Sequence, residues 1–290
     1  MSSNVNRVFI TGTIKEFSFE DSYCTFILQQ KTYYKTSEPD QNKTKISEYK
    51  VLIYKPNVLE MLRSMDRLDD LDILVNGYVA SVERDRRGTT NYVAGLVFKD
   101  DRYSNVIVGQ EIIFIHQKPS NMSEEQFKNQ LFSVNMCVLL GNTGANPEVK
   151  EFNKERGGDI KIANISVATN MHYRYHDQKR ESTTWHKVVV IASQNNLSGL
   201  VRVIENHVKR GDKLFVIGSL QSRKREDKQG DEKHSIQVIL QNNTANLSII
   251  ASKRDDEKQQ YNRAESSTNN TRSEPRDYSL EYDEEDNIPF

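Results

Sequence analysis

The chain has 290 residues, 36% of them hydrophobic and 28% charged, a length that suits about two domains of ~150 residues. Its two cysteines, Cys24 and Cys137, stand far apart and outside any CxxC or Cys/His cluster, which excludes a disulfide scaffold and a zinc finger or ribbon. No apolar run approaches the ~18 residues of a membrane span, and the first residues lack an apolar signal segment, so we expect a cytoplasmic protein.

The net charge of −1 conceals three regions of different charge. Residues 1–133 carry a net charge of −1, residues 134–251 carry +5, and residues 252–290 carry −5. The third region has almost no aliphatic side chains and is rich in Ser, Asn, Gln, Arg and Glu. Because such a composition buries too little apolar surface to offset chain entropy, we predict a disordered acidic C-terminal tail.

The first half contains five segments that are β-branched or alternate between apolar and polar residues, and they predict strands. These segments are residues 7–14, 23–30, 48–54, 72–84 and 91–99. Between the third and the fourth, residues 57–65 repeat apolar side chains at helical spacing, which predicts a helix.

Residues 117–133 follow as a linker, in which Ser123 and Gln126 form a capping-box pattern that predicts a short helix. The second half then repeats the arrangement of the first. Its predicted strands are residues 134–140, 159–169, 184–191, 212–224, 234–240 and 246–250. A helix is predicted over 198–211 between the third and the fourth strand, with Gly211 as its stop signal.

Three strands, a helix and two further strands are the order of the OB-fold, a five-stranded Greek-key barrel. Gly77 corresponds to Gly218 and residues 50–53 to 187–190, at offsets of 137 to 142 residues. The sequence therefore predicts an all-β protein of two tandem OB-folds, the first divergent, unless the first half is an unrelated small β domain. The predicted boundaries are 1–116, 117–133, 134–251, 252–282 and 283–290.

Five blocks, four in the second half and one at the end of the tail, resemble the bacterial single-stranded DNA-binding protein family in order and spacing. They are GNTGANPEVK (141–150), ISVATN (165–170), TTWHKVVV (183–190), VKRGDKLFVIGSLQSRK (208–224) and DEEDNIPF (283–290). The resemblance implies non-catalytic, largely sequence-independent binding of single-stranded DNA in replication, repair and recombination. It implies a nucleoid-associated protein without a cofactor or a metal. A chain with two OB-folds resembles the family variant in which a homodimer supplies four OB-folds.

Such a binder needs a cationic groove for phosphates and planar side chains on which bases stack. Trp185, the only tryptophan, matches a base-stacking position of the family, and Tyr173 matches another. Arg225 stands where the family often has a third Trp, and its planar guanidinium can also stack. Ile191 replaces a stacking Phe of the family. Core packing is the alternative role for Trp185.

The first half offers corresponding candidates by the repeat alignment. Tyr34, Tyr54 and Arg84 fall at the positions of Tyr173, Ile191 and Arg225. Glu48 or Tyr49 falls at the position of Trp185, so this half lacks an aromatic match unless Tyr49 supplies it. An ordinary surface or core role is the alternative for each tyrosine.

The basic side chains near the stacking candidates are candidates for phosphate contacts, although charge runs are often only solvated faces. They are Arg174, Lys179, Arg180, Lys187, Arg223 and Lys224. His186 lies beside Trp185 without a partner carboxylate or Cys pattern, so we assign it to a subunit interface, as the resemblance implies, and not to catalysis.

The last eight residues form the second predicted functional element. An acidic run precedes an apolar tripeptide and suits a basic-rimmed hydrophobic pocket on a partner protein. The residues of this tip are Asp283, Glu284, Glu285, Asp286, Ile288, Pro289 and Phe290. The resemblance implies replication, repair and recombination enzymes as its partners. A plain solubilising tail is the alternative.

Two other functions compete with strand binding. The near-neutral charge of residues 1–133 allows an OB-fold interaction subunit of a primosome type, which would dock a protein through the first half and bind DNA weakly. A nuclease is disfavoured, because the sequence has no paired carboxylates set for two metals, no nucleophile beside a base and no phosphate-binding Gly loop.

Overall fold

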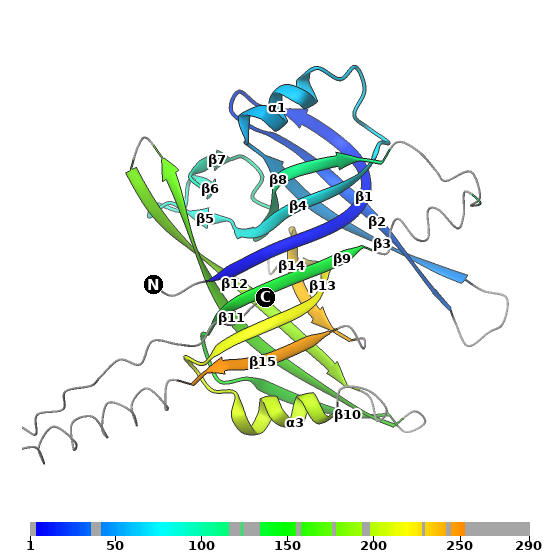
Figure 1. Ribbon diagram of the computed structural model, residues 1–290, viewed down its shortest axis with the longest axis vertical. Coiled ribbons are helices and arrows are strands. Elements are labelled where there is room, and N and C mark those ends of the chain that lie inside the picture. The colour runs from blue at the N-terminus through cyan, green and yellow to red at the C-terminus, as the bar shows by residue number, and fades with distance from the viewer. Residues whose placement is uncertain are drawn as a thin grey trace, which may run out of the picture. The chain divides into compact units, whose positions relative to one another are not determined.

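The computed structural model describes residues 4–35, 42–115, 123, 134–154, 158–175, 178–192, 198–227, 230–241 and 245–252 (Figure 1). These residues belong to one compact unit, Met1–Ser252. The second unit, Lys253–Phe290, lies outside the described residues, as does the helix predicted within 117–133 apart from Ser123. None of the described helices is long and apolar enough to cross a membrane.

Five strands of the first half close into a barrel. They are β1 (Val5–Phe19), β2 (Cys24–Lys35), β3 (Asn42–Ile53), β4 (Asp72–Ser81) and β8 (Asn105–Phe114). Strand β1 pairs with β2 and β4, β2 with β3, and β4 with β8, all antiparallel, while parallel pairing of β3 with β8 closes the ring. Helix α1 (Pro56–Arg63) joins β3 to β4, with proline at its start, where no intrahelical N–H is needed.

The second half repeats this topology. Its barrel strands are β9 (Asn135–Thr143), β11 (Gly158–Tyr175), β12 (Gln178–Ala192), β13 (Lys213–Glu226) and β14 (Glu232–Leu240), with α3 (Ser198–His207) between β12 and β13. The pairs β9–β11, β11–β12, β13–β14 and β9–β13 are antiparallel, and β12–β14 is parallel. The added strands β10 (Glu148–Lys154) and β15 (Asn246–Ala251) extend β11 and β13. The prediction of two tandem OB-folds is confirmed.

One predicted strand of the first half is wrong. Residues 91–99 are not the fifth barrel strand, because Ala94 and Gly95, both with positive φ (49° and 83°), turn the chain inside this segment. The segment instead forms β6 (Asn91–Val93) and β7 (Leu96–Phe98), which pair with β5 (Glu83–Arg84) in a separate sheet. The fifth strand of this barrel is β8, which was not predicted from the sequence. Strand β10 of the second half was not predicted either.

This separate sheet covers the outer side of the first barrel. Ile27, Leu52 and Tyr78 project out of the barrel and would otherwise meet water, since successive side chains of a strand alternate between its faces. They form a second hydrophobic cluster with Val93 and Phe98, which are 0% and 2% exposed. We call β5–β7 with the residues up to Ser104 the cap of the first barrel.

The two barrels are joined strand to strand. Strands β1 and β9 pair antiparallel, with Val8 opposite Cys137, so the main sheet runs through both halves. Figure 1 shows these two strands side by side at the centre of the molecule. Each half makes the same amide contact beside this join: the side chain of Asn6 bonds both backbone groups of Val79 within the first half, and that of Asn135 bonds both of Leu220 within the second. The pairing of β1 with β9 and these matching amide contacts show that the two halves are structurally equivalent.

Candidate nucleic-acid interface

Trp185 lies on β12 with 52% of its side chain exposed, so it is not a core residue. Its ring lies against the backbone of Gly144, where any Cβ would collide with it. The backbone N–H of Trp185 donates a hydrogen bond of 3.4 Å to Ser81 Oγ of the first half. A large aromatic plane is thus supported from beneath and left open to solvent, which is the geometry that base stacking requires.

Cationic side chains lie on the same side of the sheet as Trp185. Lys187, two residues along β12, is exposed and is in register with Gln237 of β14. Gln237 bonds Gln221 of β13 at 3.0 Å, and alternation then places the exposed Arg223 and Arg225 on this side too. We call this surface the Trp185 face. It is made by Trp185, Lys187, Gln221, Arg223, Arg225 and Gln237.

Glu48 is the first-half counterpart of Trp185. The backbone N–H of Glu48 donates to Ser222 Oγ at 3.2 Å, just as the backbone N–H of Trp185 donates to Ser81 Oγ. The neighbouring Tyr49 is 1% exposed and its hydroxyl donates to the carbonyl of Leu220. The first half therefore has a carboxylate where the second has an indole.

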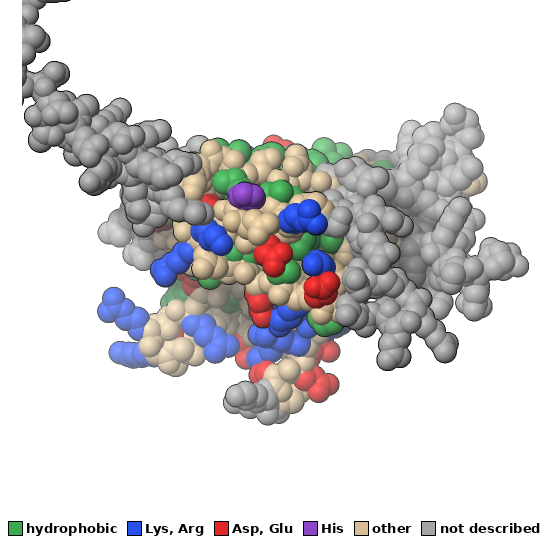
Figure 2. Space-filling model, turned by 90° about the horizontal axis from the view of Figure 1, so that it is seen from below, with side chains coloured by type: hydrophobic (Ala, Val, Ile, Leu, Met, Phe, Trp, Pro, Cys, Tyr) green, Lys and Arg blue, Asp and Glu red, His purple; other side chains and the backbone are tan. Residues whose placement is uncertain are grey.

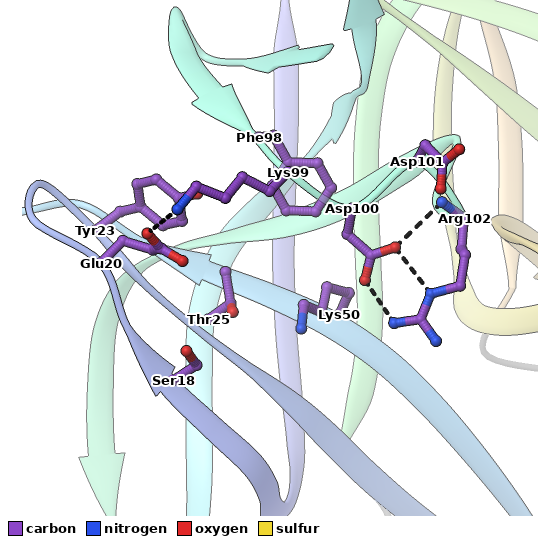
Figure 3. Close-up of a pocket in the computed structure, with 10 residues that line it drawn as sticks. All are labelled: Ser18, Glu20, Tyr23, Thr25, Lys50, Phe98, Lys99, Asp100, Asp101 and Arg102. Carbon is purple, nitrogen blue, oxygen red and sulfur yellow. Dashed lines mark hydrogen bonds and ion pairs between the residues drawn. The ribbon is translucent and has the colours of Figure 1, made fainter. Parts of the chain in front are cut away.

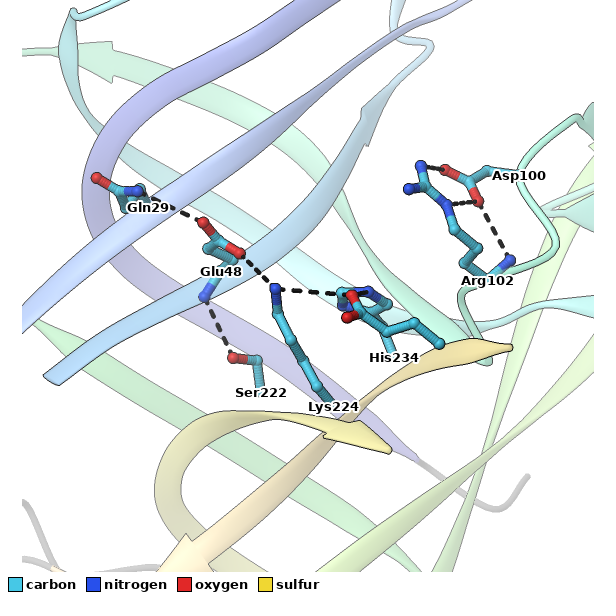
Figure 4. Close-up of polar contacts among 8 residues, drawn as sticks. Gln29, Glu48, Asp100, Arg102, Ser222, Lys224 and His234 are labelled. Carbon is cyan, nitrogen blue, oxygen red and sulfur yellow. Dashed lines mark hydrogen bonds and ion pairs between the residues drawn. The ribbon is translucent and has the colours of Figure 1, made fainter. Parts of the chain in front are cut away.

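Lys224 is bound by that carboxylate and does not belong to the Trp185 face. Its Nζ lies 3.1 Å from Glu48 Oε2 and 3.7 Å from Glu232 Oε1. Figure 4 marks the ion pair between Lys224 and Glu48. The hydrogen bond that its ammonium donates to Glu48 raises the pKa of Lys224. The predicted phosphate contact at Lys224 therefore competes with a protein carboxylate, unlike those at Lys187 and Arg223.

The outer face of the first barrel is closed. Tyr54 is half-buried against the second cluster, with its hydroxyl 3.4 Å from that of Tyr78, so its ring is not presented to solvent as a stacking plane. Beside it, a pocket of about 380 Å³ is lined by Lys50, Lys99 and Arg102 among other residues.

The charges of this pocket are largely matched within it. Lys99 pairs with Glu20 at 2.6 Å and Arg102 with Asp100 at 2.7 Å (Figure 3). Burial lowers the pKa of Lys50, which lies between them. The pocket therefore offers little uncompensated positive charge to a phosphate.

Arg84 and Arg225, the two arginines predicted to stack on bases, line one cleft of about 330 Å³ between the halves. Both side chains are exposed. Figure 2 views the molecule from below Figure 1 and shows, on the described surface seen from there, basic side chains interspersed with acidic ones. The described surface on this face is therefore of mixed charge.

Several predicted residues have side chains outside the described part of the structure. These are Tyr34, Tyr173, Arg174, Lys179 and Arg180, whose backbones lie in β2, β11 and β12. All seven residues predicted for the tip within 283–290 also lie outside it. Across the described residues, no group of three or more His, Cys, Asp or Glu could hold a metal ion.

His186, which the sequence assigns to a subunit interface, is buried within the single chain. The side chain is 2% exposed within one chain, and its Nε2 lies 2.8 Å from Thr169 Oγ1. Asn6 of the first half also donates to that hydroxyl, at 3.3 Å. His186 thus lies close to the join between the two halves. Burial lowers its pKa to about 3.

The fold and the Trp185 face define a two-OB-fold protein with an open aromatic and cationic surface on the second barrel. The family model described as the Single-strand binding protein family matches residues 134–248. A single-stranded DNA-binding protein of Rickettsia typhi is 35% identical over 163 residues, covering 54% of this chain and 98% of the relative. One of Rickettsia prowazekii is 38% identical over 120 residues, covering 41% and 73%.

This chain belongs to the single-strand binding protein family. In structure it resembles the wild-type single-stranded DNA binding protein from Thermus aquaticus, with a TM-score of 0.53, 14% identity, and coverage of 86% of this chain and 94% of that one. That likeness concerns the fold of both halves.

Proposed function

We propose that this protein binds single-stranded DNA without catalysis and largely without sequence preference, in replication, repair and recombination. The observation that carries the proposal is the Trp185 face. A solvent-exposed indole, supported by the backbone of Gly144, lies beside Lys187, Arg223 and Arg225. Every base has a π-face and every nucleotide a phosphate, so these contacts do not depend on sequence.

The similarity to single-stranded DNA-binding proteins of other organisms supports this proposal. The proteins of Rickettsia typhi and Rickettsia prowazekii are both described as single-stranded DNA-binding, and the match with the first extends over nearly its whole length. The separation of charge within the chain agrees with it, because the half that carries the Trp185 face has a net charge of +5.

Binding of fluorescein-labelled dT oligomers, measured by anisotropy at increasing salt concentration, tests the proposal. We expect log K to fall linearly with log salt, by ~0.7 for each phosphate contact on a single strand. A duplex of the same length should bind more weakly, because its bases are not free to stack on Trp185. Affinity that is independent of salt, or equal for the duplex, contradicts the proposal.

A second candidate function concerns the first half alone. The cap closes the outer face of its barrel and the charges of the adjacent pocket are largely paired, which favours a protein-interaction or primosome-type assembly role for this half. Cross-linking of the whole chain to dT carrying photoreactive thymines tests it. Adducts on Leu52, Tyr54 or Lys50 at the yield found near Trp185 contradict it.

We propose further that residues 283–290 recruit replication, repair and recombination enzymes, in a cytoplasmic homodimer that holds four OB-folds. The acidic run followed by Ile288, Pro289 and Phe290 supports the recruitment. Capture of partner enzymes on immobilised whole protein, with Phe290→Ala as the control variant, tests it. Equal capture by both proteins contradicts this role, and a monomeric mass by light scattering contradicts the homodimer.

A further inference from the structure

The cleft that contains Arg84 and Arg225 lies between the cap of the first barrel and the β13–β14 hairpin of the second. From the first half it is lined by Val82, Arg84, Asn91, Asp101, Arg102, Tyr103 and Ser104, and from the second by Arg225, Asp227 and Lys233. The two arginines are counterparts in the repeat, at an offset of 141 residues. The fold therefore brings equivalent cations of both halves to one site.

The two arginines differ from the other charged groups of the cleft. Arg102 is held by Asp100 at 2.7 Å, and Lys233 lies 4.0 Å from Asp101 and 3.9 Å from Asp227. For Arg84 and Arg225, by contrast, the part of the chain that the structure describes provides no carboxylate within 4.0 Å. Two exposed guanidinium groups thus remain to accept an anion from outside.

The walls of the cleft are held in place from both halves. Tyr103 is 9% exposed and its ring lies 4.7 Å from that of His234, while the N–H and the hydroxyl of Ser104 both donate to the carbonyl of His234. Asn105 bonds both backbone groups of Ile236. The separation of the cap from the β13–β14 hairpin is therefore fixed, and the site does not need to be assembled by a ligand.

The cleft adjoins the Trp185 face through Arg225, which belongs to both. Arg225 belongs to that face through the alternation along β13. Ser81, which accepts the hydrogen bond from the N–H of Trp185, directly precedes Val82 of the cleft wall. A strand that stacks on Trp185 and leaves along Arg223 and Arg225 would enter the cleft without crossing the capped face.

We infer that the cleft is a crossing site in which Arg84 and Arg225 bind successive phosphates of one DNA strand as it passes from the second half to the first. The first half then takes part in binding through its cap and not through its barrel face. Guanidinium groups form bidentate hydrogen bonds with phosphate oxygens, which suits this role. The inference rests on the proposed function and adds the path of the strand.

The test compares the variant Arg84→Gln/Arg225→Gln with the control Arg63→Gln/Arg202→Gln. The control removes one exposed arginine from each half as well, on helices α1 and α3, away from the cleft lining. Quenching of Trp185 fluorescence is measured with dT of ~8 and ~30 nucleotides, since one OB-fold occupies about 4–16 nucleotides.

We expect the cleft variant to bind the long strand, which meets both arginines, about 10-fold more weakly than the control does, and to lose less affinity for the short strand, which meets Arg225 alone on the Trp185 face. Its salt slope on the long strand should fall by about 1.4, which corresponds to two lost phosphate contacts at ~0.7 each. Equal long-strand affinity of the two variants overturns the crossing site, and so does an equal loss on both lengths. If neither length quenches Trp185 in the unmodified protein, the proposed function fails instead.

Discussion

Glu48 and Lys224 form an ion pair between the two halves, with 3.1 Å between Oε2 and Nζ. Glu48 occupies the position that Trp185 occupies in the second half, as the matching hydrogen bonds to Ser222 and Ser81 establish. The presence of a carboxylate in the first half, where the second half has an indole, therefore has two effects. It removes a stacking plane from the first barrel and it binds a cation that would otherwise face phosphate.

The variant Glu48→Gln tests the second of these effects. We expect it to remove the closer of the two carboxylates that hold Lys224, so that only Glu232 at 3.7 Å remains. The affinity for dT should then rise, with a salt slope that increases by up to ~0.7 for one added phosphate contact. Glu111→Gln, at an exposed carboxylate on β8, makes the same change in net charge and should leave the salt slope unchanged. Anisotropy titrations of both variants measure this, and equal slopes would show that Lys224 does not reach DNA.

Trp185→Ala should weaken binding of dT by roughly 1–3 kcal/mol, the range for loss of a base-stacking aromatic, or about 5- to 150-fold. Phe152→Ala is the matched control, because Phe152 is an aromatic residue of the same half that is 49% exposed on β10. We expect no change in its affinity. Similar losses in both variants, with circular dichroism unchanged, would show that Trp185 has no special contact with bases.

Sequence alone singled out Trp185 as a stacking candidate but did not identify its counterpart in the first half. Trp185 stands in a block whose neighbours resemble a known family, whereas the position of Glu48 depended on an alignment that was uncertain by one residue. The contacts to Ser81 and Ser222 resolve this, and they connect residues more than 100 positions apart. Such pairings have no local signal in the sequence.

The repeated OB-fold could be predicted because each barrel follows from strand order, whereas the cap could not. Residues 91–99 alternate like a strand, and only the positive φ angles of Ala94 and Gly95 divide them into β6 and β7. In β8, Gly109 and Glu111 interrupt the apolar pattern that would have identified the strand. The side chain of Lys224 is bound by a carboxylate of the other half. Its basic character alone therefore could not reveal that this cation already has a partner within the protein.

Burial of His186 should make stability depend on pH. The pKa of its imidazole is about 3 in the folded protein and ordinarily ~6.5. Between these values the unfolded chain binds a proton that the folded chain does not, so the free energy of unfolding falls as pH falls from 6.5 towards 3. The contribution is at most about 1.4 kcal/mol for each pH unit.

Urea unfolding of His186→Gln across this pH range measures the effect. The variant should lose less stability on acidification than the unmodified protein, because it lacks the buried titrating group. His172→Gln, at an exposed histidine of β11, should show the unmodified pH dependence. Parallel curves for the unmodified protein and both variants would show that His186 is not held neutral by burial.

The pairing of β1 with β9 predicts how the second half behaves alone. A fragment of residues 134–252 exposes the edge of β9, and an open edge strand is a template for pairing. Because Val8 faces Cys137 across the join, we expect two fragments to pair through β9, with Cys137 opposite Cys137. Light scattering should give the mass of a dimer, whereas a monomer at every concentration would show that β9 needs the first half as its partner.

The most direct test of the account is quenching of Trp185 fluorescence by dT, measured with the whole protein at increasing salt concentration. Since Trp185 is the only tryptophan, every change in the signal comes from the Trp185 face. We predict saturable, stoichiometric quenching at low salt that weakens as salt rises. Binding of dT that leaves the fluorescence unchanged would contradict the central claim, because the strand would then lie away from Trp185.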